Sequence, residues 1–597
     1  MCGVFGICGA LPINFPDPGD ILDNLKHRGP DDQQIFESKN LILGHTRLSI
    51  QDPGNSAQPM LSNSGDSVIS FNGEIYNKDF LRKKVPARLW KTNGDTEILL
   101  ELIELFGLDI LNEIEGMFAF AFYSLKTEEL FLGRDSIGEK PLYYVFRGQS
   151  LVFSSELRSI LPKDFCGDDI DIEGLKHYLK YLYFPTEATI HREIECLRPG
   201  NFVHYKDGQL TTASWKSNSW PQVPFRNDPK KSLRTLVGDA VKGCLVSDVP
   251  LGVMLSGGLD SSIIALEASN TLDELRTYSV SMPEHSDDNK FAALIAKKIK
   301  SNHLEILFDI QDLPELVKDT LSKTPQPFGD TAIIPLRLLT MRASKDVKVL
   351  LSGDGADELF SGYEYYDKFT EIRAHPNLSS FLRSATKAIK EFISKNRSAT
   401  TLRRDLYRIG LEYGRVSPFE IWCQDLAICD DKTISKLFRQ EMRVTKYGSV
   451  GYSNIQDILL GDQETYLPND LLLKSDSGGM LSSIEIRSPF LNSDLVTFAR
   501  NLNIDKSNKS KQYLKSAYQG SIPDEILNRR KQGFGAPIKQ WIKSGYLDDL
   551  LTTYVFNRSC QIYEMIDFES VIKLCPSNVM LTWNIMSLNI WLEANIH

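Results

Sequence analysis

The stretch VPLGVMLSGGLDSSIIA, residues 249–265, decides the fold of the second half of this chain. Its pattern predicts a buried strand, then a glycine-rich loop, then the start of a helix. The loop SGGLDSS, residues 256–262, offers successive backbone N–H groups at a helix N-terminus, an arrangement that binds phosphate groups. The loop is not a Walker A motif, because G-x-x-x-x-G-K-[ST] is absent and no lysine stands at its end.

Strands and helices alternate in the sequence that follows this loop. RTYSVSM, NKFAALIAKKIKSN, HLEILFD, DLPELVKDTLSK and VKVLLSG have in turn the patterns of a strand, a helix, a strand, a helix and a strand. The strands are almost continuously apolar, which is typical of strands covered on both faces. The sequence therefore predicts a doubly wound parallel sheet with additional helices, and from about residue 367 onward mostly helix.

The first ~210 residues have a different pattern, in which short apolar runs such as LILGHTRLSI and GMFAFAFYS are separated by turns. This spacing predicts stacked antiparallel sheets. One helix is clear in GDTEILLELIELFG, where Asp95 and Thr96 are placed to cap its start. A polar segment with three prolines, TTASWKSNSWPQVPFRNDPKK, follows. We therefore predict one domain over residues 2–212, a linker over 213–231 and a second domain over 232–597.

Composition excludes several classes of protein. Of 597 residues, 42% are apolar and 24% charged, as in ordinary soluble proteins. The net charge of −10 and the lack of long basic stretches argue against partners such as nucleic acid or an anionic membrane surface. The nine cysteines include no C-x-x-C pair, which argues against a zinc ribbon and favours a reducing compartment. Since no secretory signal and no run of ~18 apolar residues is present, we predict a cytoplasmic protein.

The amino terminus suggests a nucleophile. Cys2 follows Met1, and removal of Met1 would leave Cys2 with a free α-amine. Such an amine has a pKa of ~7.7–8.0, so near neutral pH it can take the thiol proton. One residue would then supply both the nucleophile and its base. Taken alone, Cys2 fits a buried cysteine without a chemical role better than it fits a nucleophile.

Six further motifs follow one another in the first domain: MCGVFGI, HRGPDD (27–32), GHTRLSI (44–50), FNGEIYN (71–77), GDTE (94–97) and GRDSIGEKPLYY (133–144). Together and in this order they resemble the motifs of the class II glutamine amidotransferases, the N-terminal-nucleophile family, whose fold is an αββα sandwich. The resemblance covers the whole domain and implies hydrolysis of glutamine by Cys2.

Glutamine hydrolysis requires a cation, a carboxylate and an oxyanion hole, because the substrate is a zwitterion and its amide passes through a tetrahedral intermediate. The resemblance implies that Arg47 binds the α-carboxylate and that Glu74 and Asp95 bind the ammonium group. It also implies that the Asn72 side-chain amide and the Gly73 N–H stabilise the oxyanion. Other interpretations stay open, since Asp95 fits a helix cap and Asn72–Gly73 fits a hairpin turn.

The loop SGGLDSS resembles the PP-loop of ATP pyrophosphatases, which cleave ATP between the α and β phosphates and adenylate their substrate. A second segment, VLLSGDGADELFSGY (349–363), again combines a strand, a glycine turn and an acidic helix start. Two carboxylates near a triphosphate suggest Mg²⁺, and by resemblance Asp260 and Asp357 hold magnesium pyrophosphate. A tight turn with capping serines and acids is the alternative. The other nucleotide contacts implied are Ser256, Gly257, Gly258, Ser261 and Ser262 in the loop, Ser352 and Gly353 at the adenylate, Leu255 and Val280 around the adenosine, and Lys531 at the pyrophosphate.

Both domains in this order resemble the glutamine-hydrolysing asparagine synthetases. The segments LPNDLLLKSDSGGMLSSIEIRSPFL (467–491) and IPDEILNRRKQGFGAPI (522–538) extend the resemblance toward the C-terminus, apart from a divergent helical stretch around 375–450. The implied substrates are glutamine, ATP and aspartate, and a homodimer is compatible with the resemblance.

Departures from the family pattern bear on the acceptor carboxylate. One branch has G-E-G-S-D-E where this chain has GDGADE, and that glutamate is proposed to deprotonate ammonia. Asp354 stands at that position with a carboxylate about 1.5 Å further back. Asn492 replaces the aspartate usual after P-F-L.

Aspartate and a uronic acid of a nucleotide sugar or glycan therefore both stay open as acceptors. Intact Cys2, Asp260 and Asp357 argue against a non-catalytic sensor of glutamine and nucleotide. Intact Cys2 also argues against a β-lactam-forming relative, because those enzymes have lost this cysteine.

Overall fold

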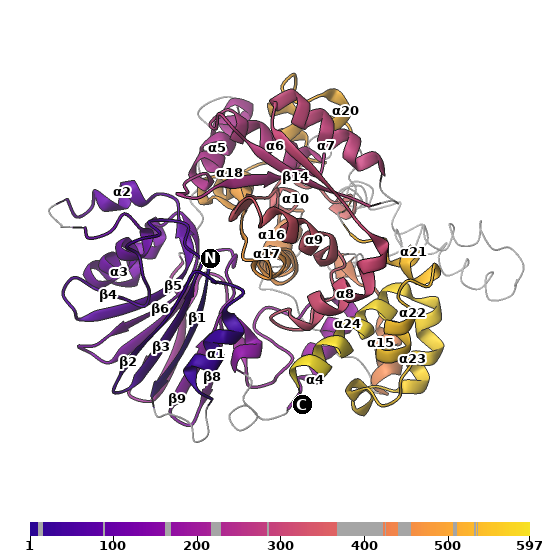
Figure 1. Ribbon diagram of the computed structural model, residues 1–597, viewed down its shortest axis with the longest axis horizontal. Helices are drawn as coiled ribbons and strands as arrows, with labels where there is room; N and C mark the ends of the chain where they lie inside the picture. The colour runs from indigo at the N-terminus through magenta and orange to yellow at the C-terminus, as the bar shows by residue number, and fades with distance from the viewer. Residues whose placement is uncertain are drawn as a thin grey trace, which may run out of the picture.

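The computed structural model has two domains that pack against each other (Figure 1). It describes residues 1–9, 16–86, 90–160, 169–216, 229–282, 286–366, 422–423, 426–439, 455–504, 510–529, 533 and 535–596. In these ranges, no helix is both long and apolar enough to cross a lipid bilayer.

The first domain is a sandwich of two antiparallel sheets with six strands each. The strand orders are β10-β8-β9-β1-β3-β2 and β12-β11-β7-β6-β5-β4. Their bounds are β1 Cys2–Gly9, β2 Asp32–Ser38, β3 Leu41–Arg47, β4 Met60–Leu61, β5 Ser67–Ile75, β6 Gly116–Ser124, β7 Glu129–Arg134, β8 Tyr143–Arg147, β9 Ser150–Ser154, β10 Glu195–Cys196, β11 Asn201–Lys206 and β12 Gln209–Ser214.

Apolar side chains fill the space between the two sheets, among them Val4, Leu43 and Leu132. Helix α1 (Pro18–Leu25) packs on the outer face of the first sheet, and α3 (Asp95–Phe106) packs on the outer face of the second. The predicted αββα sandwich is thus confirmed.

The second domain is built on a parallel sheet in the order β15-β14-β13-β16-β17. Because side chains alternate along a strand, Val349 and Leu351 face one core and Leu350 faces the other. The predicted doubly wound parallel sheet is confirmed. The strands are β13 Leu251–Met254, β14 Arg276–Ser281, β15 Asn302–Leu307, β16 Val349–Leu351 and β17 Glu485–Arg487.

Helices cover both faces of this sheet. On one face lie α5 (Pro229–Cys244), α6 (Leu259–Ser269) and α7 (Ser286–Ile299), and on the other lie α8 (Leu313–Ser322) and α9 (Ile333–Ala343), with α24 (Val579–Asn595) packed against α8. The remaining helices used below are α10 (Ala356–Phe360), α17 (Leu472–Met480), α18 (Ser493–Arg500) and α19 (Gln512–Ala517).

Several details differ from the sequence-based expectations or extend them. The three-residue strand β17 lies in a region expected to be helical. The expectation failed here because so short a strand shows no hydrophobic periodicity in the sequence. Helix α4 (Ile172–Tyr181) follows the first strands in sequence but packs beside α24, where Asn584 Nδ2 donates to the Tyr178 carbonyl at 2.9 Å (Figure 1). Most of the predicted linker lies outside the described residues, between the end of β12 and the start of α5. Most of the divergent stretch around 375–450 also lies outside them.

Candidate active site

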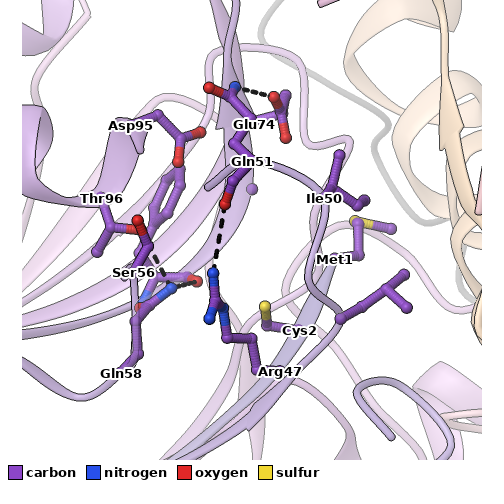
Figure 2. Close-up of a pocket in the computed structure, with 13 residues that line it drawn as sticks. Met1, Cys2, Arg47, Ile50, Gln51, Ser56, Gln58, Glu74, Asp95 and Thr96 are labelled. Carbon is purple, nitrogen blue, oxygen red and sulfur yellow. Dashed lines mark hydrogen bonds between the residues drawn. The ribbon is translucent and has the colours of Figure 1, made fainter. Parts of the chain in front are cut away.

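The pairing of β1 with β3 places Cys2 directly opposite Arg47. Both side chains point into a pocket of the first domain (Figure 2). Burial raises the pKa of the Cys2 thiol above its usual value, so the uncharged thiol is favoured. In this chain Met1 precedes Cys2, and the Met1 ammonium pairs with Glu485 Oε2 at 2.8 Å. The pocket is lined by Met1, Cys2, Arg47, Leu48, Ile50, Gln51, Ser56, Gln58, Phe71, Gly73, Glu74, Asp95 and Thr96.

Asn72 and Gly73 lie inside the nine-residue strand β5, so the alternative of a hairpin turn is wrong. Asn72 is fully buried, and its Oδ1 accepts a hydrogen bond from Cys2 N at 2.9 Å. Its Nδ2 is buried and has no hydrogen-bond partner among the described residues. A Cβ on Gly73 would stand 2.3 Å from the Met117 carbonyl oxygen, so only glycine fits here. The unused amide N–H of Asn72 is a donor available to a bound group.

Arg47 holds the loop of residues 51–53 beside the pocket. Its guanidinium donates to the carbonyls of Pro53 at 2.9 Å, Asp52 at 3.0 Å and Gln51 at 3.3 Å. These three acceptors are neutral, so a carboxylate placed there would be a stronger partner for the guanidinium.

Two carboxylates lie at the opposite end of the pocket from Cys2 (Figure 2). Glu74 accepts a hydrogen bond from the Gln51 side chain and pairs with Arg487 Nη2 at 3.2 Å. Asp95 Oδ2 accepts from Ile75 N at 3.0 Å. Burial raises the pKa of both carboxyl groups above their usual values. An ammonium group between them would favour their charged forms and be bound in return.

The expectation that Asp95 and Thr96 cap α3 is wrong. Gly94 occupies the N-cap position, and no side chain caps this helix. Asp95 is instead the first helical residue, and its carboxylate bonds to β5. Thr96 Oγ1 accepts from Gln58 Nε2 at 3.1 Å.

The glycine-rich loop joins β13 to α6, as the sequence predicts. Gly257 has a φ of +71°, and a Cβ there would lie 2.6 Å from Ala292 N, so the loop requires glycine. The hydroxyls of Ser256 and Ser261 lie 3.0 Å apart and close the turn. Leu255, next to the loop, is buried, and its N–H donates to the Tyr278 carbonyl at 2.8 Å. Val280 is buried near the end of the adjacent strand β14.

The segment after β16 comes close to this loop. A Cβ on Gly353 would stand 2.9 Å from Asp260 Cβ and 3.2 Å from Ser261 N. The residues predicted to hold the nucleotide are therefore brought together from two segments of the chain. Ser262 is fully buried in α6, and its hydroxyl has no hydrogen-bond partner among the described residues.

Asp260 and Asp357 converge on one cation, the ammonium of Lys511. Lys511 Nζ lies 2.5 Å from Asp260 Oδ2 and 2.6 Å from Asp357 Oδ1. The described residues contain no group of three or more histidine, cysteine, aspartate or glutamate side chains that could hold a metal. Magnesium prefers oxygen ligands, so the two carboxylates of Asp260 and Asp357 fit this ion and would hold it.

Asp354 is fixed by two hydroxyl donors. Ser352 Oγ donates to its Oδ2 at 2.9 Å, and Ser475 Oγ of α17 donates to the same oxygen at 2.7 Å. Next to Ser475, Lys474 Nζ pairs with Asp330 Oδ2 at 3.4 Å. Lys531 was also expected here, but it lies outside the described residues.

Asn492 does not belong to this group. Its Oδ1 caps α18 by accepting from the backbone of Asp494 and Leu495, and its Nδ2 donates to Glu115 of the first domain at 3.0 Å. An amide supplies both the acceptor and the donor that this position uses. The replacement of the usual aspartate is thus explained by packing, without a contact to Asp354.

Sequence reasoning missed four charged residues around the two sites: Arg28, Lys474, Asp476 and Lys511. Arg28 lies in the motif HRGPDD, and Lys474 and Asp476 lie in the segment 467–491. These motifs were recognised without a role for each residue. Lys511 lies in a lysine- and serine-rich segment that shows no signal, so only its contact with two distant aspartates reveals it.

Comparisons with known proteins agree with these observations. The family model described as "Asparagine synthase" matches residues 232–593, and the one described as "Glutamine amidotransferase domain" matches residues 1–216. Asparagine synthetase [glutamine-hydrolyzing] 1 of Bacillus subtilis is 28% identical over 627 residues, covering 100% of this chain and 97% of the relative. A putative asparagine synthetase of Mycobacterium tuberculosis is 29% identical, covering 92% of this chain and 88% of the relative. Asparagine synthetase B of Escherichia coli is 33% identical, covering 62% and 66%.

Proposed function

The chain belongs to the asparagine synthase family, and on that premise we propose that it amidates aspartate with nitrogen from glutamine. The reaction is aspartate + ATP + glutamine → asparagine + AMP + PPi + glutamate. The first domain releases ammonia from glutamine, and the second adenylates the acceptor carboxylate.

In the glutaminase half, Cys2 attacks the side-chain carbonyl of glutamine after its own α-amine takes the thiol proton, which requires prior loss of Met1. Arg47 binds the α-carboxylate in place of its present carbonyl partners. Glu74 and Asp95 bind the ammonium group at the other end of the pocket. Collapse of the tetrahedral intermediate releases ammonia and leaves a thioester on Cys2, and water then hydrolyses this thioester to glutamate and the free thiol.

The observation that supports this half most directly is the unused donor of Asn72. Its buried Nδ2 has no acceptor among the described residues, while its Oδ1 holds Cys2 N. A tetrahedral intermediate on Cys2 would bring an oxyanion to this donor and to Gly73 N–H. A buried donor left unpaired in the resting protein is stabilised most when charge develops on the substrate.

In the synthetase half, the loop 256–262 and Gly353 would bind the phosphates and the adenylate. Asp260 and Asp357 would hold Mg²⁺, which when bound neutralises charge on the leaving pyrophosphate. Lys511 already holds both carboxylates in place for this task.

Charges near Asp354 favour aspartate over a uronic acid. Lys474 is a cation suited to a carboxylate of the acceptor. Asp330 and Asp470 lie beside it, and Asp470 Oδ1 is buried without a hydrogen-bond partner among the described residues. Burial and the neighbouring Asp330 raise the pKa of Asp470. An ammonium group would satisfy these carboxylates, and aspartate has one whereas a uronic acid has none.

An acceptor screen tests the proposal. The purified protein is supplied with ATP, Mg²⁺ and glutamine, and with aspartate, glucuronate or a nucleotide-linked uronic acid in turn. AMP, PPi and glutamate are measured together. We expect equal amounts of all three with aspartate alone. AMP release with a uronic acid and none with aspartate would show that the uronic acid is the acceptor. Absence of AMP with every acceptor would refute carboxylate activation.

A further inference from the structure

One buried arginine of the first domain contacts both the nucleophile residue and the second domain. Arg28 Nε donates to the carbonyl oxygen of Cys2 at 3.1 Å. Its two terminal nitrogens bind both oxygens of Asp476, at 2.9 and 3.1 Å. Glu156 accepts a further bond from Nη1 at 3.2 Å. The side chains of Arg28 and Asp476 are both 0% exposed, so the pair is shielded from bulk solvent.

Asp476 lies on α17, the helix that also reaches the proposed acceptor site. The two residues before it are Ser475, which bonds to Asp354, and Lys474, which pairs with Asp330. A rigid helical turn therefore joins the partner of Arg28 to the two groups that would meet the acceptor. Figure 1 shows α17 on the side of the second domain that faces the first.

The start of α17 departs from regular helix. Residues Leu467–Leu471 form a π-helical turn directly before it. Such turns occur frequently at functional sites and interrupt the regular hydrogen-bond ladder of a helix. This turn also carries Asp470, the buried carboxyl beside Asp330. The regular hydrogen-bond ladder is therefore interrupted directly before the helix that carries Lys474, Ser475 and Asp476.

We propose that Arg28 and Asp476 form a positioning link that makes glutamine hydrolysis at Cys2 depend on the state of the acceptor site. The inference rests on the proposed function. Binding and adenylation of the acceptor change what Ser475 and Lys474 contact, and α17 moves with them. A two-point arginine–carboxylate pair transmits this movement because its planar geometry is fixed. Arg28 then shifts the Cys2 carbonyl and with it the nucleophile, so ammonia forms when an acceptor is ready.

Such coupling is measurable as a change in one site caused by ligands of the other. Glutamate release by the wild-type protein is measured with and without ATP and aspartate. We expect kcat/KM for glutamine to rise at least about fivefold when both are present, the lower end of typical coupling factors. The rise should lie mainly in kcat, because Arg28 touches the nucleophile residue and not the glutamine-binding groups.

The variant Asp476→Asn keeps the shape of the side chain and removes its charge. In this variant we expect kcat/KM for glutamine to rise less than about twofold when ATP and aspartate are added. Glutaminase activity without ATP, and synthesis from free ammonia, should stay within about threefold of wild type. Glutamate should then form in excess over AMP. The matched control is Lys348→Met, which removes another ion pair between the domains, the 2.7 Å contact of Lys348 with Asp31, at a partly exposed place. It should leave the response unchanged.

The outcomes separate this inference from the proposed function. A wild-type protein that hydrolyses glutamine and releases AMP but shows no response overturns the coupling and leaves the function intact. A protein that does neither overturns the function. Equal loss of response in Lys348→Met and Asp476→Asn would show that the Arg28–Asp476 pair only holds the two domains together. If Asp476→Asn fails to fold, Arg28→Lys replaces it, since it keeps the charge of the pair and removes its two-point geometry. An unchanged response in a folded Arg28→Lys would then refute the link.

Discussion

Replacement of Asn72 by alanine should stop glutamine hydrolysis without affecting synthesis from ammonia. The variant removes the buried Nδ2–H proposed to bind the oxyanion, and one such donor is worth about 10²–10³ in kcat, or roughly 2.7–4 kcal/mol. It also removes the acceptor of Cys2 N, and leaving a buried donor unpaired costs about 1–3 kcal/mol of folding stability. We therefore expect kcat for glutamate release to fall at least about 100-fold, with a smaller change in KM.

A second variant separates the catalytic effect from the loss of stability. Ser70 lies two residues earlier on β5, is also fully buried, and bonds to His45 Nδ1 at 2.9 Å. Ser70→Ala should cost a similar amount of stability in a denaturant titration and leave kcat nearly unchanged. The assay measures glutamate with glutamine as donor and AMP with ammonium chloride as donor. A fall in kcat of less than about fivefold in folded Asn72→Ala would refute the assigned role, as would an equal loss with ammonia.

Further variants test the other assigned groups. Cys2→Ala should abolish amide formation from glutamine and spare synthesis from ammonia, because the nucleophile and the nucleotide loop lie on different domains. Equal loss with both nitrogen donors in a folded variant would contradict two separate sites. Asp260→Ala and Asp357→Ala should each abolish PPi release and spare glutaminase, and the double variant should cost little more than either, because both would hold one metal ion. Mild, additive losses of PPi release would indicate that these residues only cap helices. Asp354→Asn should retain ATP–PPi exchange while amide formation falls by on the order of 10²–10⁴, the range for a positioned acid or base. A parallel loss of exchange would instead make Asp354 a nucleotide or metal ligand.

The three-dimensional structure changed the interpretation of particular residues more than that of the fold. Asn72–Gly73 has the composition of a turn, yet both residues lie inside β5 because β6 pairs along its whole length. Asp95 has the composition of a helix cap, yet Gly94 takes that position and Asp95 bonds to β5. In both cases a local preference was compatible with two environments, and packing against a distant strand selected one.

The sequence by itself determined the architecture of the two halves and the family that each of them resembles. The loop 256–262 is contiguous, so its strand, its glycines and its helix can be recognised together. The alternation of strands and helices likewise reflects local periods that do not depend on distant contacts. The order of motifs after Cys2 is also a property of the chain alone.

Only the tertiary structure decided which charges meet. Lys511 lies 251 residues from Asp260 and still bridges it to Asp357, and Arg28 lies 448 residues from Asp476. Strand β17 lies far beyond β16 in sequence and still pairs with it, which brings Arg487 to Glu74. The physical reason is that a buried charge must find a partner, and the partner it finds is set by how whole elements pack rather than by neighbouring residues. The links between the two sites are therefore visible only in the folded chain.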